Sequence, residues 1–349
     1  MSPSIPTSAG TWPLELSVVL FLAAAAVITV FGIWMTRLAS LLADRTGMGQ
    51  AVMGAVFVGA STSLPEIVTS LTAAAGNHPD LAVGNAVGSI AGQTALLAVA
   101  DMTYRRANLE HAAASAANLM MGGLLVVLLS LPLLAMGIPR FALWHIHPVS
   151  FLMILAYVFG VRLVSQTQSE PMWYPARTRE TLQPRRGQHR RGGSTAVLWL
   201  RFAVASAFMG AAGWILARSG VSIAAHTGLS ETAVGGVLTG LSSSLPELIT
   251  AVTAVRIGAL NLAVADVLGG NAFDVTIVGL SDLAYRKGPI YEALSPLDGF
   301  LLSLSILLTG ILLMGMLRRE KHGIANIGLE SFLVLVLYGA GVAVLVLAR

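Results

Sequence analysis

Two glutamates of this chain stand in the middle of long apolar stretches, each at the end of the same short motif. The motif is Ser-Leu-Pro-Glu, and it ends at Glu66 in one stretch and at Glu247 in the other. A charge at the centre of a bilayer costs at least roughly 2.5 to 3.5 kcal/mol on insertion scales, so an intramembrane glutamate is a functional hypothesis by default. No Lys or Arg stands at that depth on the neighbouring stretches to form an ion pair. The two carboxylates are therefore candidate cation ligands.

Each motif also predicts a break in its own helix. Pro65 and Pro246 lack an N–H and clash with the carbonyl four residues earlier, which frees the carbonyls of Ser61 and Ser242. Freed backbone at membrane depth is tolerated only where it is buried in protein or lines a wet cavity. The hydroxyl groups beside the two breaks belong to Thr62, Ser63, Ser243 and Ser244. Carbonyl, hydroxyl and carboxylate oxygens are thus expected to come together at each break.

A second polar position follows each glutamate on the next apolar stretch, at the same separation along the chain in both cases. It is Gln93 after the first motif and Asp274 after the second, and one helical turn before them stand Ser89 and Gly270. The pooled side chains offer only oxygen ligands and the Gln amide, with no His, Cys, Lys or Arg. Such a set suits hard cations such as Ca²⁺ or Na⁺ and argues against zinc or copper. The predicted cation ligands are Glu66, Glu247, Asp274, Gln93, Thr62, Ser63, Ser243, Ser244 and Ser89.

These motifs belong to an internal repeat. When the chain is moved along itself until Gly59 lies over Gly240, GASTSLPEIVTSLTA lies over GLSSSLPELITAVTA, and Asp101 lies over Asp282. From Thr46 to Arg106 roughly a third of the positions are identical without a gap. Duplication of an ancestral segment is the natural explanation.

The composition of the 349 residues is that of a membrane protein. Only 11% are charged and 55% are hydrophobic, whereas a typical soluble domain has about 25% charged residues. The absence of cysteine excludes disulfide scaffolds and thiol catalysis. Ten stretches are long enough to cross roughly 30 Å of hydrocarbon. They are residues 14–43, 48–75, 81–102, 112–135, 147–165, 196–217, 229–256, 262–283, 297–317 and 328–347.

We therefore predict an all-α integral membrane protein with ten transmembrane helices, built as two inverted five-helix repeats. The first half covers residues 1–165, with its repeat at about 46–106. The second half covers residues 196–349, with its repeat at about 227–287. Because five is odd, the second half enters the membrane in the opposite orientation. Inverted repeats with a site at the midplane are a recurring plan of secondary transporters.

The basic residues predict the orientation and explain the pI near 9.8 without nucleic acid. Sixteen of the 21 Lys and Arg fall in loops on one side, including the Pro-, Gly- and Arg-rich linker 166–195. The positive-inside rule then places this linker in the cytoplasm and both termini outside, in a multi-pass protein of the cell membrane. The linker is a solvated loop or a binder of anionic lipid headgroups.

The motifs resemble the two α-repeats of the calcium/cation antiporter superfamily, and most closely those of its sodium/calcium exchangers. The resemblance rests on GASTSLPEIVTS with GNAVGSIAGQ and on GLSSSLPELITA with ADVLGGNAFD. It implies a ten-helix antiporter that exchanges Ca²⁺ for Na⁺ by alternating access, with Glu66 and Glu247 as central calcium ligands. Thr62, Ser63, Ser243 and Ser244 would add hydroxyl or carbonyl oxygens, and Ser89, Gln93 and Asp274 would complete flanking sodium positions.

Three departures from the family pattern leave the driving ion open between Na⁺ and H⁺. Gln93 stands where Asn is usual, Gly270 replaces a hydroxyl, and Asp266 stands where Asn is common. The Gly-Gly-Asn-Ala run that starts at Gly269 also resembles the proton/calcium branch of the superfamily. Asp266 itself is expected to be either a proton-sensitive gating carboxylate or a hydrogen-bonded cap.

The alternatives to an antiporter are an intramembrane lipid-phosphate hydrolase and a passive channel. Phosphoryl chemistry needs cationic groups, and the predicted site has none. Broken helices with bunched carboxylates favour saturable binding over a channel. We expect no enzymatic activity, no cofactor and no nucleic-acid partner, only inorganic cations and the lipid bilayer. The helices 14–43 and 196–217 are expected to slide across a stationary site.

Three sets of residues are assigned structural roles. Asp101 and Asp282 are expected to be interfacial anchors or cap partners. His145 and His147 are placed in a solvated external loop. The glycines of the four site helices are expected to provide close packing surfaces rather than ligand cradles.

Overall fold

A computed structural model describes residues 11–46, 62–103, 114–138, 142–169, 194–256, 260–318 and 328–348, and these ranges are helical without a β-strand. The first half holds α1 (Leu14–Thr46), α4 (Leu64–Ala75), α5 (Pro79–Thr103), α7 (Ala116–Gly137) and α8 (Pro148–Ser169). The second half begins with α9 (Thr195–Thr227), α10 (Glu231–Ala233), the π-helix η3 (Val234–Thr239), α11 (Gly240–Ser243) and α12 (Leu245–Arg256). It ends with α13 (Leu260–Ala284), the 3₁₀ turn η4 (Ile290–Glu292), α14 (Pro296–Arg318) and α15 (Leu329–Leu347).

The helices agree with the ten predicted spans. Eight of the described helices are long and apolar enough to cross a membrane, and α4 and the broken segment α10–α12 account for the other two spans. One predicted length is wrong, because α9 continues to Thr227 instead of ending at residue 217. The first part of the span 48–75, including Ser61, lies outside the described residues, as does most of the linker 166–195.

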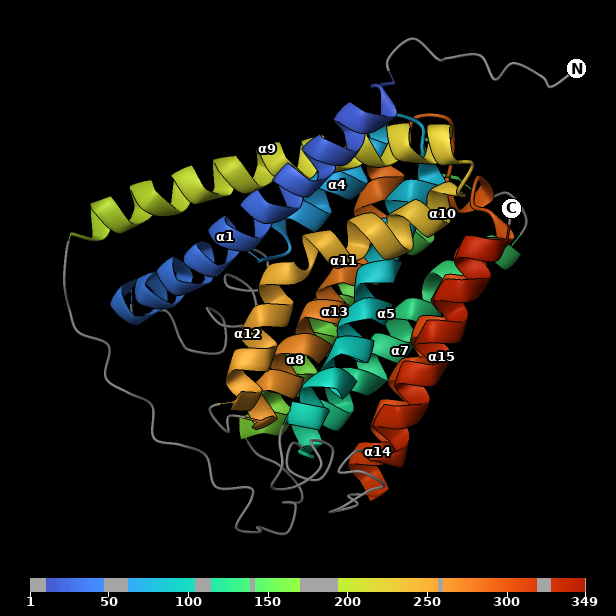
Figure 1. Ribbon diagram of the computed structural model, residues 1–349. Helices are drawn as coiled ribbons and strands as arrows, with labels where there is room; N and C mark the ends of the chain where they lie inside the picture. Colours follow the sequence, from blue (N-terminus) through green and yellow to red (C-terminus); the bar gives the residue numbers. More distant parts are fainter. Residues whose placement is uncertain are drawn as a thin grey trace, which may run out of the picture.

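The repeat extends over whole halves of the chain. The shift that places Gly59 over Gly240 also places Leu14, which begins α1, over Thr195, which begins α9. The same shift relates the first residues of α4 and α12 and those of α5 and α13. The equivalent helices α1 and α9 lie side by side and antiparallel (Figure 1). Equivalent helices that run in opposite directions are what inverted repeats require.

Two contacts, one at the ends and one in the middle of the helices, hold α1 and α9 together. The N–H of Trp12, before α1, donates to Ser222 near the end of α9 at 3.0 Å. Phe31 stacks on Phe208 with ring centroids 4.5 Å apart. The start of one helix therefore lies beside the end of the other.

Helices α1 and α9 are longer than a perpendicular crossing needs. Each has 33 residues and is therefore about 50 Å long at 1.5 Å per residue. A bilayer core is about 30 Å thick, so helices of this length cross it at a tilt. Figure 1 shows both lying obliquely across one side of a bundle formed by the other helices.

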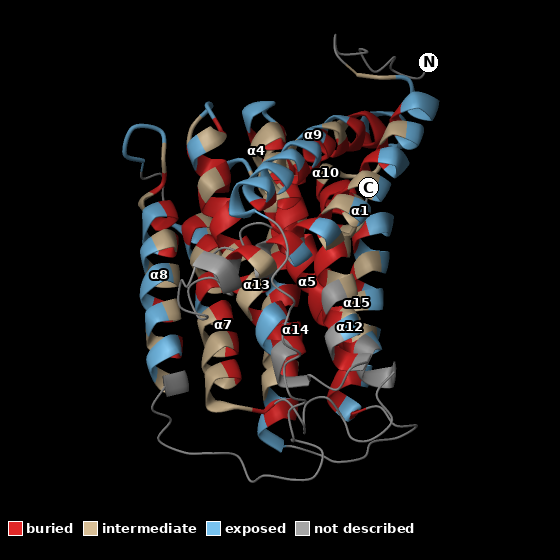
Figure 2. Ribbon diagram, turned by 90° about the vertical axis from the view of Figure 1, so that its left-hand side faces the viewer, coloured by how far each residue is buried: buried red, intermediate tan, exposed pale blue. Residues whose placement is uncertain are grey.

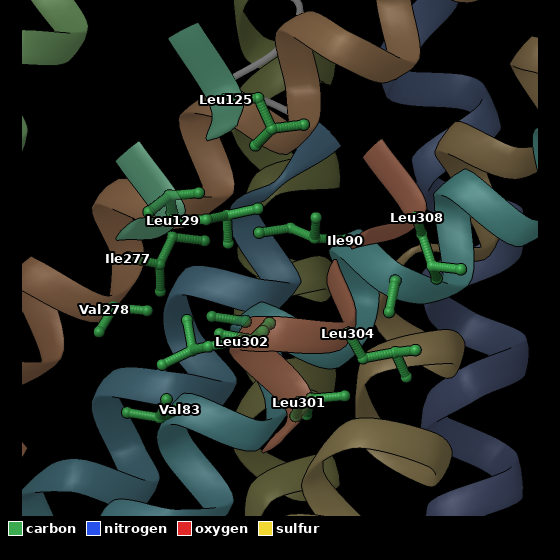
Figure 3. Close-up of a cluster of buried hydrophobic side chains, with 14 of the residues drawn as sticks. Val83, Ile90, Leu125, Leu129, Ile277, Val278, Leu301, Leu302, Leu304 and Leu308 are labelled. Carbon is green, nitrogen blue, oxygen red and sulfur yellow. The ribbon is translucent and has the colours of Figure 1, made fainter. Parts of the chain in front are cut away.

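Helices α5 and α13 form the centre of that bundle. In the apolar windows of α5 and α8, 89% and 22% of the residues are buried, so α5 is enclosed on all sides while α8 faces outward (Figure 2). Ile90 of α5, Leu129 of α7, Ile277 of α13 and Leu308 of α14 are fully buried in one cluster (Figure 3). Interdigitated apolar side chains of this kind hold the inner helices in fixed relative positions.

Glycines bring α5 into backbone contact with the broken span of the second half. A Cβ added at Gly88 would lie 2.1 Å from the Cα of Gly236 in η3, and one added at Gly240 would lie 2.8 Å from the backbone nitrogen of Ser89. Neither position has room for a side chain. The predicted packing role of these glycines is therefore confirmed, since small residues let membrane helices approach closely.

A buried network closes the end of the bundle where α13 ends and α8 begins. Asp282 accepts hydrogen bonds from the N–H groups of His147 (2.8 Å) and Ile290 (2.7 Å) and from the Ser150 hydroxyl (2.6 Å). The Tyr291 hydroxyl lies 2.8 Å from Ser150 Oγ, and burial raises the pKa of Tyr291, so this hydroxyl stays protonated. The role of Asp282 as a cap partner is thus confirmed.

The prediction for His147 was wrong, whereas His145 is exposed as expected. Only 4% of His147 is exposed. Its Nδ1 accepts the N–H of Val149 at the start of α8, and its ring packs edge-on against Tyr291. The sequence places His147 in a loop, but the side chain caps a helix and is covered by the turn that follows α13.

Asp282→Ala is expected to destabilise the protein without changing its ion site. It would leave two buried backbone N–H groups without an acceptor, at about 1 to 3 kcal/mol each. Thermal unfolding of the purified protein in detergent should show a lower Tm, with a smaller loss for Asp282→Asn, which keeps one acceptor oxygen. An unchanged Tm for Asp282→Ala would contradict this assignment.

Candidate functional site

The two predicted helix breaks lie at Ser63 and Ser244. Ser63 has φ −77° and ψ 4°, and Ser244 has φ −86° and ψ 1°, so the two turns have the same conformation. Helices α4 and α12 start immediately after them, with Pro65 and Pro246 in the first turn, where a backbone N–H has no helical partner. Both glutamates therefore sit at the beginning of a short helix, inside the protein.

The serines of the two breaks contact the acids of the opposite repeat. Ser63 Oγ lies 2.8 Å from Asp274 Oδ1 and 3.1 Å from Glu247 Oε1. Ser244 donates to Glu66 Oε1 at 2.5 Å. Each half thus supplies the hydroxyl that binds the other half's glutamate, and the candidate site lies where the two repeats meet.

Gln93 makes a second link between two of the acids. Its Nε2 lies 3.0 Å from Glu247 Oε2 and 3.4 Å from Asp274 Oδ2. Glu247 and Asp274 are therefore held together by the Ser63 hydroxyl on one pair of oxygens and by the Gln93 amide on the other. The Thr62 hydroxyl also faces Glu247.

All nine predicted ligands are buried, with at most 7% of any side chain exposed. Two of them do not contact the acids directly. Ser89 donates to the Ala86 carbonyl at 2.9 Å and Ser243 to the Gly240 carbonyl at 3.1 Å, each within its own helix. Their oxygens keep free lone pairs but do not link the two repeats. Asp266 is exposed, and no described residue hydrogen-bonds to it, which disfavours its predicted role as a cap.

The acids alone do not form a metal site. In the part of the chain that the structure describes, no group of three or more His, Cys, Asp or Glu side chains is placed so that it could hold an ion. In this arrangement, a cation between the described acids would also use hydroxyl, amide and carbonyl oxygens. Glu66 Oε2 is one open position, because it is buried and has no hydrogen-bond partner among the described residues.

Two buried asparagines near the site were not predicted as ligands. Asn85 donates to Ser70 Oγ at 3.0 Å and Asn271 to Thr94 Oγ1 at 3.2 Å, and neither Oδ1 has a partner among the described residues. The signal for Asn271 was the Gly-Gly-Asn-Ala run. The repeat comparison hid it, since the equivalent position in the first half is Ile90.

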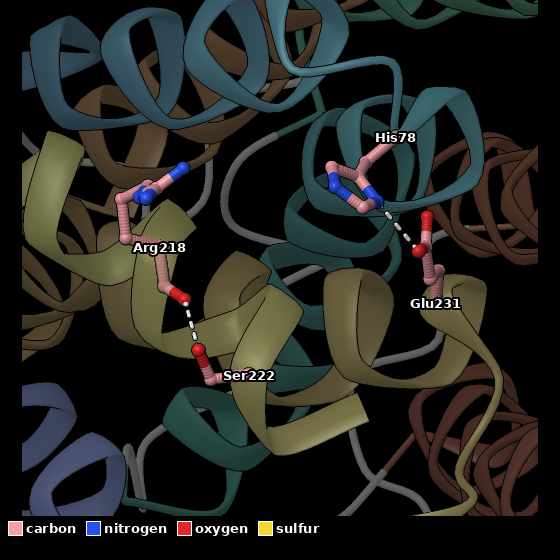
Figure 4. A network of polar contacts seen from close by, with 4 residues as sticks. All are labelled: His78, Arg218, Ser222 and Glu231. Carbon is pink, nitrogen blue, oxygen red and sulfur yellow. Dashed lines mark hydrogen bonds and ion pairs between the residues drawn. The ribbon is translucent and has the colours of Figure 1, made fainter. Parts of the chain in front are cut away.

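An ion pair at the end of the bundle lies apart from this site. His78, in the turn between α4 and α5, contacts Glu231 of α10 at 2.7 Å (Figure 4). The side chains are 32% and 31% exposed, and pairs in water contribute at most about 1 kcal/mol. The same view shows Ser222 donating to the Arg218 carbonyl within α9. Glu231 is therefore a suitable control position when glutamates of the candidate site are substituted.

Two inverted five-helix repeats with broken helices at their interface define the class of inverted-repeat membrane transporters. The profile of the sodium/calcium exchanger protein family matches residues 16–166 and 197–347, one match for each half. The chain belongs to this family, whose members are antiporters rather than enzymes, and it is a multi-pass membrane protein.

Curated relatives and solved structures agree with this assignment. The chain is 31% identical to the inner membrane protein YrbG of Escherichia coli (strain K12) over 247 residues, covering 69% of this chain and 71% of that one. It is 29% identical to the putative antiporter CaxA of Alkalimonas amylolytica over 322 residues, covering 84% and 89%.

The fold resembles that of two solved proteins. The sodium-calcium exchanger NCX_Mj, soaked with 100 mM Na⁺ and 10 mM Sr²⁺, superimposes with a TM-score of 0.57 at 19% identity, covering 95% of this chain and 99% of that one. Native YfkE superimposes with a TM-score of 0.62 at 16% identity, covering 96% and 93%. The family resemblance stated from the motifs is confirmed.

Proposed function

We propose that this protein exchanges Ca²⁺ for Na⁺ by alternating access at the site between its repeats. The observation that carries the proposal is the reciprocal contact of Ser63 with Glu247 and of Ser244 with Glu66. A site whose oxygens come from both halves is reorganised when the halves move relative to each other. That coupling of ion binding to movement is what an antiporter needs.

The charge of the site supports competition between ions. Three carboxylates, Glu66, Glu247 and Asp274, are buried within one interface, whereas Ca²⁺ brings two positive charges. Like charges in a low dielectric do not all remain ionised and unpaired, so an empty site takes up protons or Na⁺. A carrier with neutralised carboxylates crosses between its two states more easily than one with bare charges. Exchange therefore replaces one cation by others instead of releasing the site empty.

The packing of the tilted helices supports a moving role for α1 and α9. A Cβ at Gly32 of α1 would lie 2.3 Å from Pro246 Cγ, and one at Gly213 of α9 would lie 2.8 Å from the Pro65 carbonyl oxygen. Gly32 and Gly213 are equivalent positions of the repeat, as are the two prolines, so the same pair of positions meets in both halves, through the proline ring in one and the proline backbone in the other. Each tilted helix thus faces the helix break of the opposite repeat with a glycine. Because glycine has no side chain to interlock with the break, this contact suits sliding.

The alternative driving ion is H⁺, and one observation favours it. Gly270 provides no hydroxyl at a position where Ser89 stands in the first repeat, so one oxygen is missing from a flanking cation position. A protonated carboxylate needs fewer ligands than a bound Na⁺.

The topology that we propose places residues 166–195 in the cytoplasm and both termini outside the cell membrane. Its support is the excess of Lys and Arg in loops of one side. Everted vesicles would then expose the linker, and a protease added outside them should cut it.

Everted vesicles that contain this protein are expected to take up Ca²⁺ when a Na⁺ gradient is imposed and not when only a pH gradient is imposed. The physical reason is that Na⁺ entering the flanking positions displaces Ca²⁺ from shared carboxylates. Uptake is measured with radiolabelled Ca²⁺ against vesicles without the protein. Uptake under the pH gradient alone would select the proton alternative, and no uptake under either gradient would reject both.

A further inference from the structure

The side-chain amide of Gln93 has a defined orientation between two acids of the candidate site. Gln93 Nε2 is fixed between Glu247 and Asp274, at 3.0 and 3.4 Å. Ionised carboxylates only accept hydrogen bonds, so the amide is assigned with its nitrogen toward the acids. The oxygen Oε1 of the same amide then faces away from them.

That oxygen lies over Gly270. A Cβ built on Gly270 would lie 3.9 Å from Gln93 Oε1, and no other atom of the described residues outside its own helix backbone lies within 4 Å of it. No described residue donates a hydrogen bond to Gln93 Oε1. Gly270 is one helical turn before Asp274 on α13, so the space above it belongs to the same side of the helix as the acid.

We infer that Gln93 Oε1 takes the place of the ligand oxygen that residue 270 lacks. The inference rests on the proposed Na⁺/Ca²⁺ exchange. The side chain of Gln is one methylene longer than that of Asn, and the absent side chain of Gly270 leaves room for that extra length. With Asn at position 93 and Ser at position 270, the serine on α13 would supply this oxygen. With Gln93 opposite Gly270, the longer amide on α5 supplies it instead. The oxygen serves the monovalent cation that flanks the calcium position.

The paired substitutions are expected to compensate for each other. Gln93→Asn removes the oxygen from above Gly270, so Na⁺ should displace bound Ca²⁺ about tenfold less effectively. Gly270→Ser alone should also weaken Na⁺ binding, because the new side chain, built only 3.9 Å from Gln93 Oε1, then shares with the long amide the space that the cation needs. The double variant Gln93→Asn/Gly270→Ser supplies a hydroxyl where the amide oxygen has been withdrawn. It should return to within about twofold of the wild-type protein.

The experiment measures the Na⁺ concentration that displaces half of the radiolabelled Ca²⁺ bound to the purified full-length protein in detergent. The matched control is Gln93→Asn/Gly269→Ser, since a Cβ at Gly269 meets no described atom within 4 Å and the hydroxyl would be one position away. This control should be as weak as Gln93→Asn alone. The amount of Ca²⁺ bound at saturation reports whether each variant is folded.

The outcomes separate this inference from the proposed function. Rescue by Gly270→Ser but not by Gly269→Ser supports the inference. The inference is overturned, while Na⁺ coupling stands, by either of two results. One is that the effects of the two single substitutions on Na⁺ competition multiply in the double variant. The other is that Na⁺ displaces Ca²⁺ from the Gln93→Asn protein as effectively as from the wild type. If Gln93→Asn does not fold, Gly270→Ser remains decisive, because Na⁺ competition as strong as in the wild type would overturn the inference. Wild-type protein whose bound Ca²⁺ is not displaced by Na⁺ at all would refute the proposed function and, with it, the role of the oxygen.

Discussion

Glu247→Gln is expected to abolish calcium exchange in everted vesicles. Glu247 is 7% exposed and binds the Ser63 hydroxyl with one oxygen and the Gln93 amide with the other. The substitution removes one of three negative charges from the interface and places a second amide beside Gln93. Removing one member of a buried charged set costs about 3 kcal/mol or more, which is roughly 100-fold in Ca²⁺ affinity. Uptake and equilibrium binding of radiolabelled Ca²⁺ measure the two effects.

The matched comparison is the same substitution at two other glutamates. Glu66→Gln should be as severe, because Glu66 is fully buried and bound by Ser244 from the opposite repeat. Glu231→Gln should transport like the wild-type protein, since its partner His78 is a partly exposed surface residue. Wild-type uptake by the Glu247→Gln protein would remove the central claim of the proposed function. A strong loss with Glu231→Gln would show that the assay reports general damage.

Many features of the fold were predictable because the same motif occurs in both repeats. The motif around Pro65 and Pro246 predicts a break in each repeat, and the observed turns at Ser63 and Ser244 lie one residue before α4 and α12. A missing N–H acts within one helical turn, so its consequence is local and can be read from the chain. Apolar length likewise predicts a crossing helix from local composition alone.

The partners across the interface could not be predicted in this way. Spacing puts Ser63 near Glu66 in its own helix, yet its hydroxyl binds Glu247 and Asp274. This exchange depends on how two helices from different halves approach each other, and glycines such as Gly88 set that approach through packing that no single segment determines. Ser89 and Ser243, which looked equivalent to the linking hydroxyls, instead bind their own helices.

The burial of two other residues was also not predicted. Asn271 is buried beside Thr94 but corresponds to Ile90, so a comparison of the two halves gives it no support. His147 was assigned to a solvated loop because it lies where a predicted external loop meets the next span, and the turn that covers it comes from residues near Tyr291, far along the chain. Both errors arise where tertiary contacts decide burial.

Gly213→Ala is expected to slow exchange without abolishing Ca²⁺ binding. The added methyl group would lie 2.8 Å from the Pro65 carbonyl oxygen and 3.2 Å from Val68 Cβ, atoms that cannot turn away as the end of a flexible side chain can. Overpacking of this kind costs about 1 to 3 kcal/mol, and the proposed sliding of α9 would meet that cost as the methyl group passes the break. A barrier higher by this amount lowers the rate about 5- to 150-fold. Gly32→Ala should act in the same way, because its methyl group would lie 2.3 Å from the ring of Pro246, the repeat equivalent of Pro65.

The control is Gly210→Ala, one turn earlier on the same helix, where the nearest atom of another helix, Val68 Cγ2, would be 3.9 Å from the methyl group. This distance is an ordinary van der Waals contact, so Gly210→Ala should exchange Ca²⁺ at the wild-type rate. Initial rates of Ca²⁺ uptake in vesicles and equilibrium Ca²⁺ binding in detergent are measured for all three variants. If Gly213→Ala and Gly32→Ala both exchange at the wild-type rate, α1 and α9 do not slide past the breaks, and the moving part of the carrier lies elsewhere. If both lose binding together with exchange, the glycines are needed to build the site, because Pro65 and Pro246 directly precede its two glutamates.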